Sequence, residues 1–123
     1  MRRALVIEDN ENNMELITFI LEESNYRTLK AETGQKGVAL ALQERPDFII
    51  LDIQLPDISG TEVLTMIRSS EIGGSIPIIA MTSYAMAGDR EKLLAAGCDG
   101  YIEKPIDPIT VMNQIEKVVG DHQ

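Results

Sequence analysis

Residues 48–60 read FIILDIQLPDISG. The first four form a short apolar run with two β-branched residues, which predicts a buried strand. Asp52 follows this run directly, and the next residues include Pro56, Asp57, Ser59 and Gly60, all of which favour turns. The segment therefore predicts a central strand that ends in a carboxylate, then a loop, then a helix.

The same unit, a short apolar run followed by a longer amphipathic segment, occurs five times along the chain. This alternation predicts an α/β fold in which helices cover a parallel sheet. The predicted strands are 4–7, 26–31, 48–51, 77–81 and 101–102; the predicted helices are 12–23, 33 or 35 to 44, a third that ends at Arg68, 86–96 and 108–119. Pro46 ends the second helix, Gly97 ends the fourth and Asp107 begins the last.

The composition is that of one globular domain, expected to span residues 1–123. The chain is 44% hydrophobic and 25% charged. Acidic residues outnumber basic ones 20 to 11, and a net charge of −9 repels a polyanion, so direct binding to nucleic acid is not expected. The apolar runs are far shorter than the roughly 20 residues of a membrane span. We find no signal peptide and only one cysteine, Cys98, so we expect a cytoplasmic protein.

Carboxylates are expected to gather at one edge of this sheet. Right-handed crossovers place the C-terminal ends of parallel strands at the same edge, where ligands bind in open α/β sheets. Glu8 and Asp9 follow the first strand, and Asp52 follows the third. Carboxylates in such a cluster repel one another unless a cation compensates, and Mg²⁺ suits carboxylates, water and phosphate oxygens. The alternative role for Asp9 is a helix N-cap, which Asn10 could also provide.

Two other strand ends carry groups that suit phosphate oxygens. Thr82, at the end of the fourth strand, offers a hydroxyl, and Lys104, after the fifth, offers a compact cation. Taken singly, such residues are more often capping or solvated surface residues. Together with the carboxylates, they indicate a site for a phosphoryl group and a divalent cation.

These residues and their spacing resemble the signature of response-regulator receiver domains. The matching motifs are Glu8, Asp9 and Asn10; Asp52 with Leu55, Pro56, Ser59 and Gly60; Thr82 and Ser83; and Lys104 and Pro105. The successive separations are 43 residues from Asp9 to Asp52, 30 from Asp52 to Thr82 and 22 from Thr82 to Lys104, and they are similar to those of the family. The resemblance covers the whole chain and implies a flavodoxin-like, doubly wound (βα)5 sandwich with strand order 2-1-3-4-5. Segments 85–89, 96–98 and 104–106 resemble single-domain regulators and the receivers of hybrid kinases.

The resemblance implies a role for each residue of the site. Asp52 is the expected phosphoacceptor, which attacks a phosphohistidine of a histidine kinase or a histidine phosphotransfer protein. Asp9, Asp52 and the Gln54 carbonyl are expected to hold Mg²⁺, with Glu8 reaching it through water. Lys104 is expected to assist the transfer by stabilising charge on the phosphoryl group.

The resemblance also implies how the signal leaves the site. Thr82 would move toward the phosphoryl group, and Tyr101, three residues before Lys104, would turn into the vacated space. This switch would change a surface that docks a downstream protein, with the receiver acting as a monomer or a phosphorylation-dependent dimer. The bulky Tyr84 stands where the family varies phosphate lifetime, and it favours a long-lived phosphate.

Three alternatives remain at this stage. A receiver fragment of a larger regulator or hybrid kinase would show the same motifs, although Met1 and the polar ending favour a complete single-domain regulator. An aspartyl-nucleophile phosphohydrolase usually has a second aspartate two residues after the first, where this chain has Gln54. A docking module that is never phosphorylated tends to lose an acid, the hydroxyl or the lysine, all of which are present. We therefore expect a receiver that assists only its own phosphorylation and dephosphorylation, not an enzyme.

Overall fold

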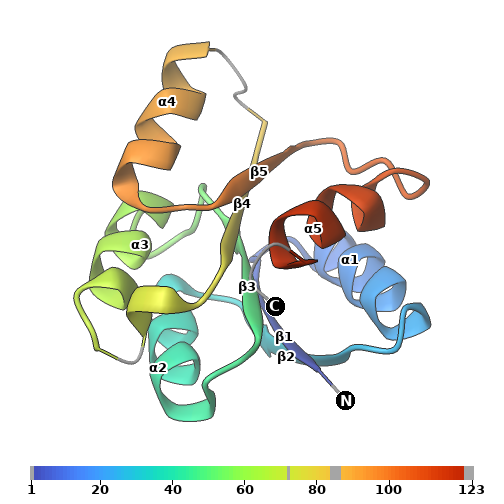
Figure 1. The fold of residues 1–123 in the computed structure, drawn as a ribbon, viewed down its shortest axis with the longest axis horizontal. Coiled ribbons are helices and arrows are strands. Elements are labelled where there is room, and N and C mark those ends of the chain that lie inside the picture. The colour runs from blue at the N-terminus through green and yellow to red at the C-terminus, as the bar shows by residue number, and fades with distance from the viewer. Residues whose placement is uncertain (1, 72, 84–86, 121–123) are drawn as a thin grey trace.

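The computed structural model describes residues 2–71, 73–83 and 87–120, and within them five parallel strands form one sheet in the order β2-β1-β3-β4-β5 (Figure 1). The strands are β1 (Arg3–Ile7), β2 (Arg27–Ala31), β3 (Phe48–Asp52), β4 (Ile78–Thr82) and β5 (Gly100–Glu103). The helices are α1 (Glu11–Glu23), α2 (Gly34–Glu44), α3 (Gly60–Arg68), α4 (Ala87–Ala96) and α5 (Val111–Gly120), with a 3-10 turn, η1 (Gly73–Ser75), before β4. The expected fold class and strand order are confirmed.

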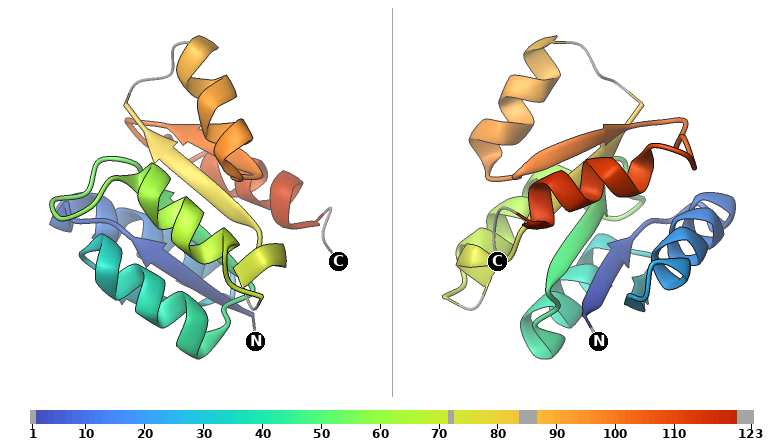
Figure 2. Two further views of the ribbon diagram at one scale, coloured as in Figure 1. Left: turned by 90° about the vertical axis from the view of Figure 1, so that its left-hand side faces the viewer. Right: turned by 45° about the vertical axis from the view of Figure 1, so that its right-hand side comes forward.

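Helices cover both faces of the sheet (Figure 1 and Figure 2). α1 and α5 lie on one face, and α2, α3 and α4 lie on the other. Alternate residues of β3 therefore enter different cores: Phe48 and Ile50 pack toward α1 and α5, whereas Ile49 and Leu51 pack toward the other helices. Because both faces are covered, β3 is buried along its whole length, which explains its unbroken apolar run. None of the helices within the described ranges has the length and apolarity of a bilayer span.

Side-chain caps define where α1 and α2 begin. The Asn10 side chain accepts a hydrogen bond from the Asn13 backbone N–H at 2.9 Å, and Thr33 accepts one from the Lys36 N–H at 3.2 Å. Of the two candidate N-caps of α1, Asn10 takes the role and Asp9 does not. The carboxylate of Asp9 is therefore not used to cap the helix.

The start of α5 differs from the prediction. The helix begins at Val111 rather than at Pro108. The preceding residues form a turn in which the Asp107 side chain accepts a hydrogen bond from the Ile109 N–H at 3.0 Å. The Asp107 carbonyl also accepts hydrogen bonds from the N–H groups of Thr110 and Val111. Asp107 thus organises this segment as predicted, but the regular helix follows one turn later.

β5 is longer than the predicted two-residue strand. It runs from Gly100 to Glu103 because both end residues pair with β4, Gly100 with Ile79 and Glu103 with Thr82. The predicted start of α4, Met86, lies outside the described residues. The bounds of the other predicted elements agree with the structure to within one residue.

Arg68, at the end of α3, joins three segments at the edge where β4 begins. Its guanidinium donates hydrogen bonds to the Gly97 carbonyl at 2.9 Å, the Ile76 carbonyl at 2.7 Å and the Asp99 carboxylate at 2.9 Å. The same Asp99 oxygen accepts the Ile78 N–H at 2.8 Å. These contacts hold α3, the start of β4 and the connection from α4 to β5 together, opposite the edge that carries the predicted site.

Candidate functional site

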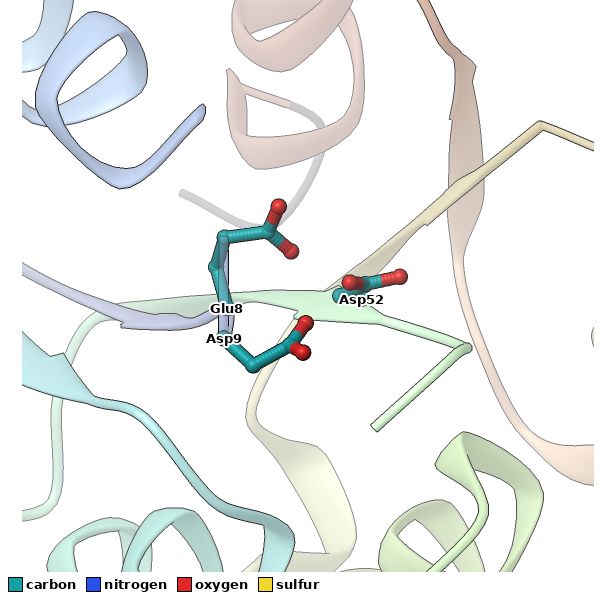
Figure 3. Close-up of side chains that lie close together, drawn as sticks. All are labelled: Glu8, Asp9 and Asp52. Carbon is teal, nitrogen blue, oxygen red and sulfur yellow. The ribbon is translucent and has the colours of Figure 1, made fainter. Parts of the chain in front are cut away.

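Glu8, Asp9 and Asp52 meet at the edge where the strands end. β1 and β3 are neighbours, with Ile7 paired to Leu51, so the residues that end or follow them emerge side by side. One oxygen of each carboxylate lies within 4.8 Å of the others, and Figure 3 shows the three side chains close together at the ends of the strands. Glu8 and Asp52 are 0% and 2% exposed, whereas Asp9 is exposed. The cluster therefore combines two buried acids with one that faces solvent.

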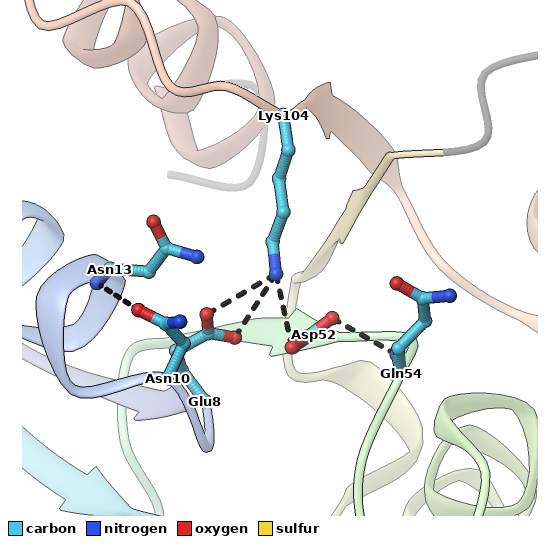
Figure 4. Close-up of polar contacts among 6 residues, drawn as sticks. All are labelled: Glu8, Asn10, Asn13, Asp52, Gln54 and Lys104. Atoms are coloured by element: carbon cyan, nitrogen blue, oxygen red, sulfur yellow. Dashed lines mark hydrogen bonds and ion pairs between the residues drawn. The ribbon is translucent and has the colours of Figure 1, made fainter.

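Lys104 extends from the end of β5 into this cluster (Figure 4). Its Nζ lies 3.1 Å from Asp52 Oδ2 and 3.2 Å from Glu8 Oε1. The backbone holds the residue in place, because the Lys104 N–H donates to the Thr82 carbonyl at 2.8 Å. The peptide bond between Lys104 and Pro105 is cis. The side chain is only 13% exposed, so one ammonium is shared by two carboxylates away from bulk water.

The negative charge of the cluster exceeds what Lys104 compensates. Burial, and then the hydrogen bond and charge of Asp52, raise the pKa of Glu8 from 4.5 to about 7, although Asn13 and Lys104 act in the opposite direction. Burial lowers the pKa of Lys104, but Asp52 and Glu8 outweigh it and leave this pKa above its usual value. The ammonium is thus positively charged at neutral pH and contacts Glu8 and Asp52, and Asp9 adds a third acidic group to the cluster. This donor set fits a hard divalent cation, which prefers carboxylate oxygens and would relieve the excess charge.

The loop after β3 places Gln54 beside Asp52. The Gln54 N–H donates to Asp52 Oδ1 at 2.9 Å (Figure 4). The preceding Ile53 is fixed at both backbone groups, since its N–H donates to the Met81 carbonyl at 3.1 Å and its carbonyl accepts the Gly60 N–H at 2.9 Å. The residue predicted to offer a backbone oxygen to the metal therefore lies next to the predicted phosphoacceptor.

Thr82 and Tyr101, the predicted switch residues, lie on neighbouring strands. Thr82 is buried at the end of β4, one residue after Met81, which pairs with Asp52. Tyr101 is half-buried on β5 and packs against the core on the side of α2, α3 and α4. Tyr101 also lines a surface cavity of about 460 Å³ with Glu103, Pro105, Asp107, Thr110 and Gln114. Tyr84 lies outside the described residues.

Two contacts near the site were not predicted from the sequence. Lys104 pairs with Glu8 although 96 residues separate them, and sequence spacing alone does not reveal which acid a lysine will contact. Asp57, expected only to form a turn, accepts backbone hydrogen bonds from the first residues of α2. Its place in a turn after β3 was the only sequence signal for this residue.

Known proteins share both the sequence pattern and the fold. The pattern of the response regulator receiver domain matches residues 4–116. The polar-differentiation response regulator DivK of Brucella anthropi is 39% identical over 120 residues, which cover 98% of each chain. DivK of Brucella ovis is equally similar, at 39% identity and the same coverage.

Solved structures agree with these sequence relatives. The receiver domain of the sensor histidine kinase PA1611 from Pseudomonas aeruginosa, solved with a magnesium ion in its active-site cleft, is 34% identical. It matches with a TM-score of 0.88 over 97% of this chain and 98% of that chain. The chemotaxis response regulator CheY4 of Vibrio cholerae, at 24% identity, shares the fold with a TM-score of 0.92 over 96% of this chain and 98% of its own. The family match, the relatives and the acidic cluster at the strand ends thus lead to one conclusion: this chain belongs to the response-regulator receiver domain family.

Proposed function

We propose that residues 1–123 act as one receiver domain that accepts a phosphoryl group on Asp52 from the phosphohistidine of a histidine kinase or histidine phosphotransfer protein. The observation that carries this proposal is the position of Asp52 between Lys104 Nζ, 3.1 Å from Oδ2, and the Gln54 N–H, 2.9 Å from Oδ1. In the proposed step, a carboxylate oxygen attacks phosphorus, the P–N bond to the imidazole breaks, and an acyl phosphate forms.

The surrounding side chains would stabilise charge rather than react covalently. Phosphoryl transfer depends mainly on positioning and on compensation of the negative charge spread over the phosphoryl oxygens. Lys104 is suited to this role because its ammonium is held by two buried carboxylates and would be drawn toward a phosphoryl group on Asp52. Thr82 would donate its hydroxyl to a phosphoryl oxygen from the neighbouring strand end.

The proposed Mg²⁺ ligands are Asp9, Asp52 and the Gln54 carbonyl, with Glu8 reaching the ion through water. A bound ion would supply positive charge to the phosphoryl oxygens. The gathering of three acidic side chains within 4.8 Å of one another beside a single ammonium supports this assignment, as does the magnesium ion in the cleft of the Pseudomonas receiver. The protein's own contribution is to hold its carboxylates at the strand ends and to orient Asp52 through Gln54 and Lys104.

The proposed output is a change in a docking surface, with Thr82 and Tyr101 as the switch. A phosphoryl group adds about −1.5 to −2 charge and three acceptor oxygens, which would attract the Thr82 hydroxyl. Tyr101 lines a cavity of about 460 Å³, so a reorientation of its ring would reshape the surface there. A downstream protein, or a second receiver, would bind one form better than the other. In this proposal the domain assists its own modification and does not turn over an external substrate.

Labelling with a small phosphodonor tests the phosphoacceptor. Purified wild type, Asp52→Asn and Asp47→Asn are incubated with acetyl phosphate and Mg²⁺, and the acyl phosphate is measured by intact-protein mass spectrometry. Asp47 is exposed just before the start of β3 and is the matched control for an aspartate at the far end of that strand. We expect labelling of wild type and Asp47→Asn only. Undiminished labelling of Asp52→Asn would overturn the assignment of Asp52 as the phosphoacceptor.

The NMR signals of Tyr101 test the proposed switch in the same samples. Signals that are unchanged between unlabelled and labelled wild type would overturn the role of Tyr101 in the switch.

A further inference from the structure

Asp57 attaches the loop after β3, residues 53–59, to the start of α2. Its Oδ1 accepts the Gly34 N–H at 2.8 Å, and its Oδ2 accepts the Gln35 N–H at 3.0 Å. These donors belong to the first turn of a helix, where backbone N–H groups have no partner within the helix. One carboxylate thus connects two segments that lie 22 to 23 residues apart in sequence.

Close packing at Gly34 holds the same loop against α2. A Cβ atom at this position would lie 2.5 Å from Ile58 Cγ1 and 2.9 Å from Val63 Cγ2. Ile58, the residue after Asp57, therefore occupies the space that a side chain at position 34 would need. The loop contacts α2 through both a polar and an apolar group.

Electrostatics favours the same arrangement. The N–H groups of Gln35 and Gly34 lower the pKa of Asp57 below its usual value, so its carboxylate is ionised at neutral pH. Negative charge is favourable at a helix N-terminus, and α2 has no acidic residue of its own in the first turn. The loop supplies this charge from outside the helix.

We propose that Asp57 is a positioning residue for the phosphoacceptor site, an inference that rests on the proposed function. The loop that it anchors contains Gln54, whose N–H donates to Asp52 and whose carbonyl is a proposed metal ligand. Sites carried on loops need supporting contacts that fix their geometry. Without the anchor at Asp57, the loop has more conformations, and fewer of them keep Gln54 beside Asp52.

The α2 N-cap provides a matched control. Thr33 accepts the Lys36 N–H at 3.2 Å, so it caps the same helix from the helix's own chain. Thr33→Ala removes a cap from α2 and leaves both Asp57 hydrogen bonds possible. Asp57→Ala removes partners of α2 and also the anchor of the loop. The comparison therefore separates a weaker helix from a displaced loop.

The experiment compares wild type, Asp57→Ala, Asp57→Asn and Thr33→Ala, each shown to be folded by circular dichroism. Amide hydrogen exchange at Gln54 is first measured by NMR in the absence of metal. Mg²⁺ affinity is then measured by titration. Finally, the rate of phosphorylation by acetyl phosphate is followed over a range of Mg²⁺ concentrations. Asp57→Asn keeps one acceptor oxygen and serves as the milder variant if Asp57→Ala does not fold.

For Asp57→Ala we expect Gln54 exchange to be about threefold to tenfold faster, the equivalent of losing one hydrogen bond. Mg²⁺ affinity is expected to fall by about threefold to tenfold, less than the roughly 10–100-fold typical of groups that contact a metal ligand directly. Saturating Mg²⁺ should restore the phosphorylation rate, because affinity rather than the reacting groups is altered. Asp57→Asn should be intermediate, and Thr33→Ala should match wild type.

Equal effects of Asp57→Ala and Thr33→Ala on Gln54 exchange and Mg²⁺ affinity would overturn the inference, because the stability of α2 would then explain both. A wild-type protein that neither binds Mg²⁺ nor becomes phosphorylated would overturn the proposed function instead. In that case the metal-free exchange at Gln54 still decides whether Asp57 positions the loop.

Discussion

Glu8→Gln is expected to remove a pH dependence from the stability of the metal-free protein. Glu8 is fully buried, and its pKa is raised from 4.5 to about 7, first by burial and then by the hydrogen bond with Asp52. The folded protein therefore keeps this proton up to a pH near 7, whereas the unfolded chain releases it near 4.5. Because the folded state binds more protons in this window, the free energy of unfolding must fall as pH rises through it.

The size of this effect follows from the two pKa values. Their difference of about 2.5, at about 1.4 kcal/mol for each pKa unit, corresponds to about 3 kcal/mol of stability lost between pH 4.5 and 7. A glutamine does not titrate, so the variant avoids this loss. Asp57, with a lowered pKa, titrates below this window, and Lys104, with a raised pKa, titrates above it. Neither residue interferes with the comparison.

The assay is urea unfolding at several pH values from 5 to 8, followed by circular dichroism with a chelator present. Glu8→Gln should gain stability relative to wild type by about 2–3 kcal/mol between the two ends of this range, because a small part of the loss in wild type already occurs below pH 5. Glu15→Gln, an exposed change on α1, is the control and should run parallel to wild type. A constant difference between Glu8→Gln and wild type at every pH would refute the reasoning.

Two substitutions away from the site test the packing of the fold. Arg68→Ala removes hydrogen bonds to two carbonyls and one carboxylate from a side chain only 19% exposed, and should lower the free energy of unfolding by about 2–4 kcal/mol. A loss below about 1 kcal/mol in urea unfolding would contradict this view of the network. In Gly37→Ala, the new Cβ would lie 2.5 Å from Ile7 Cδ1, so an overpacking cost of about 1–3 kcal/mol should exceed the gain in helix propensity. Gly120→Ala is its control, because among the described residues no atom outside the helix's own backbone lies within 4 Å of the new Cβ; equal behaviour of the two alanine variants would contradict the clash.

The sheet could be predicted well because its strands are buried on both faces. β3 shows this clearly, since a strand covered by helices on either side needs apolar residues at successive positions, and such a run is visible in the sequence. The start of α5 was less predictable. Pro108 suits both the first turn of a helix and an isolated turn, and Asp107 can cap either one, so local sequence did not distinguish them.

The site could be predicted only as far as strand direction determines it. The backbone topology of parallel strands brings Glu8, Asp9 and Asp52 to one edge of the sheet, independently of the contacts that their side chains make. The partners of Lys104 and Asp57 depend instead on tertiary distances. A turn-forming aspartate in the sequence does not reveal that its loop lies against α2, so its hydrogen bonds to that helix appear only in the structure.

The ion pair between Lys104 and Glu8 also has a consequence for folding. The two residues are 96 positions apart, and they meet only when β1, β3, β4 and β5 are all in register. Contacts of such high sequence separation carry a large loop-closure cost and slow folding. A partly folded chain with β5 undocked would hold Asp52 without its lysine. If Asp52 and Lys104 act as proposed, such a chain would lack the ammonium that assists the transfer, so the ability to be phosphorylated would depend on the docking of β5.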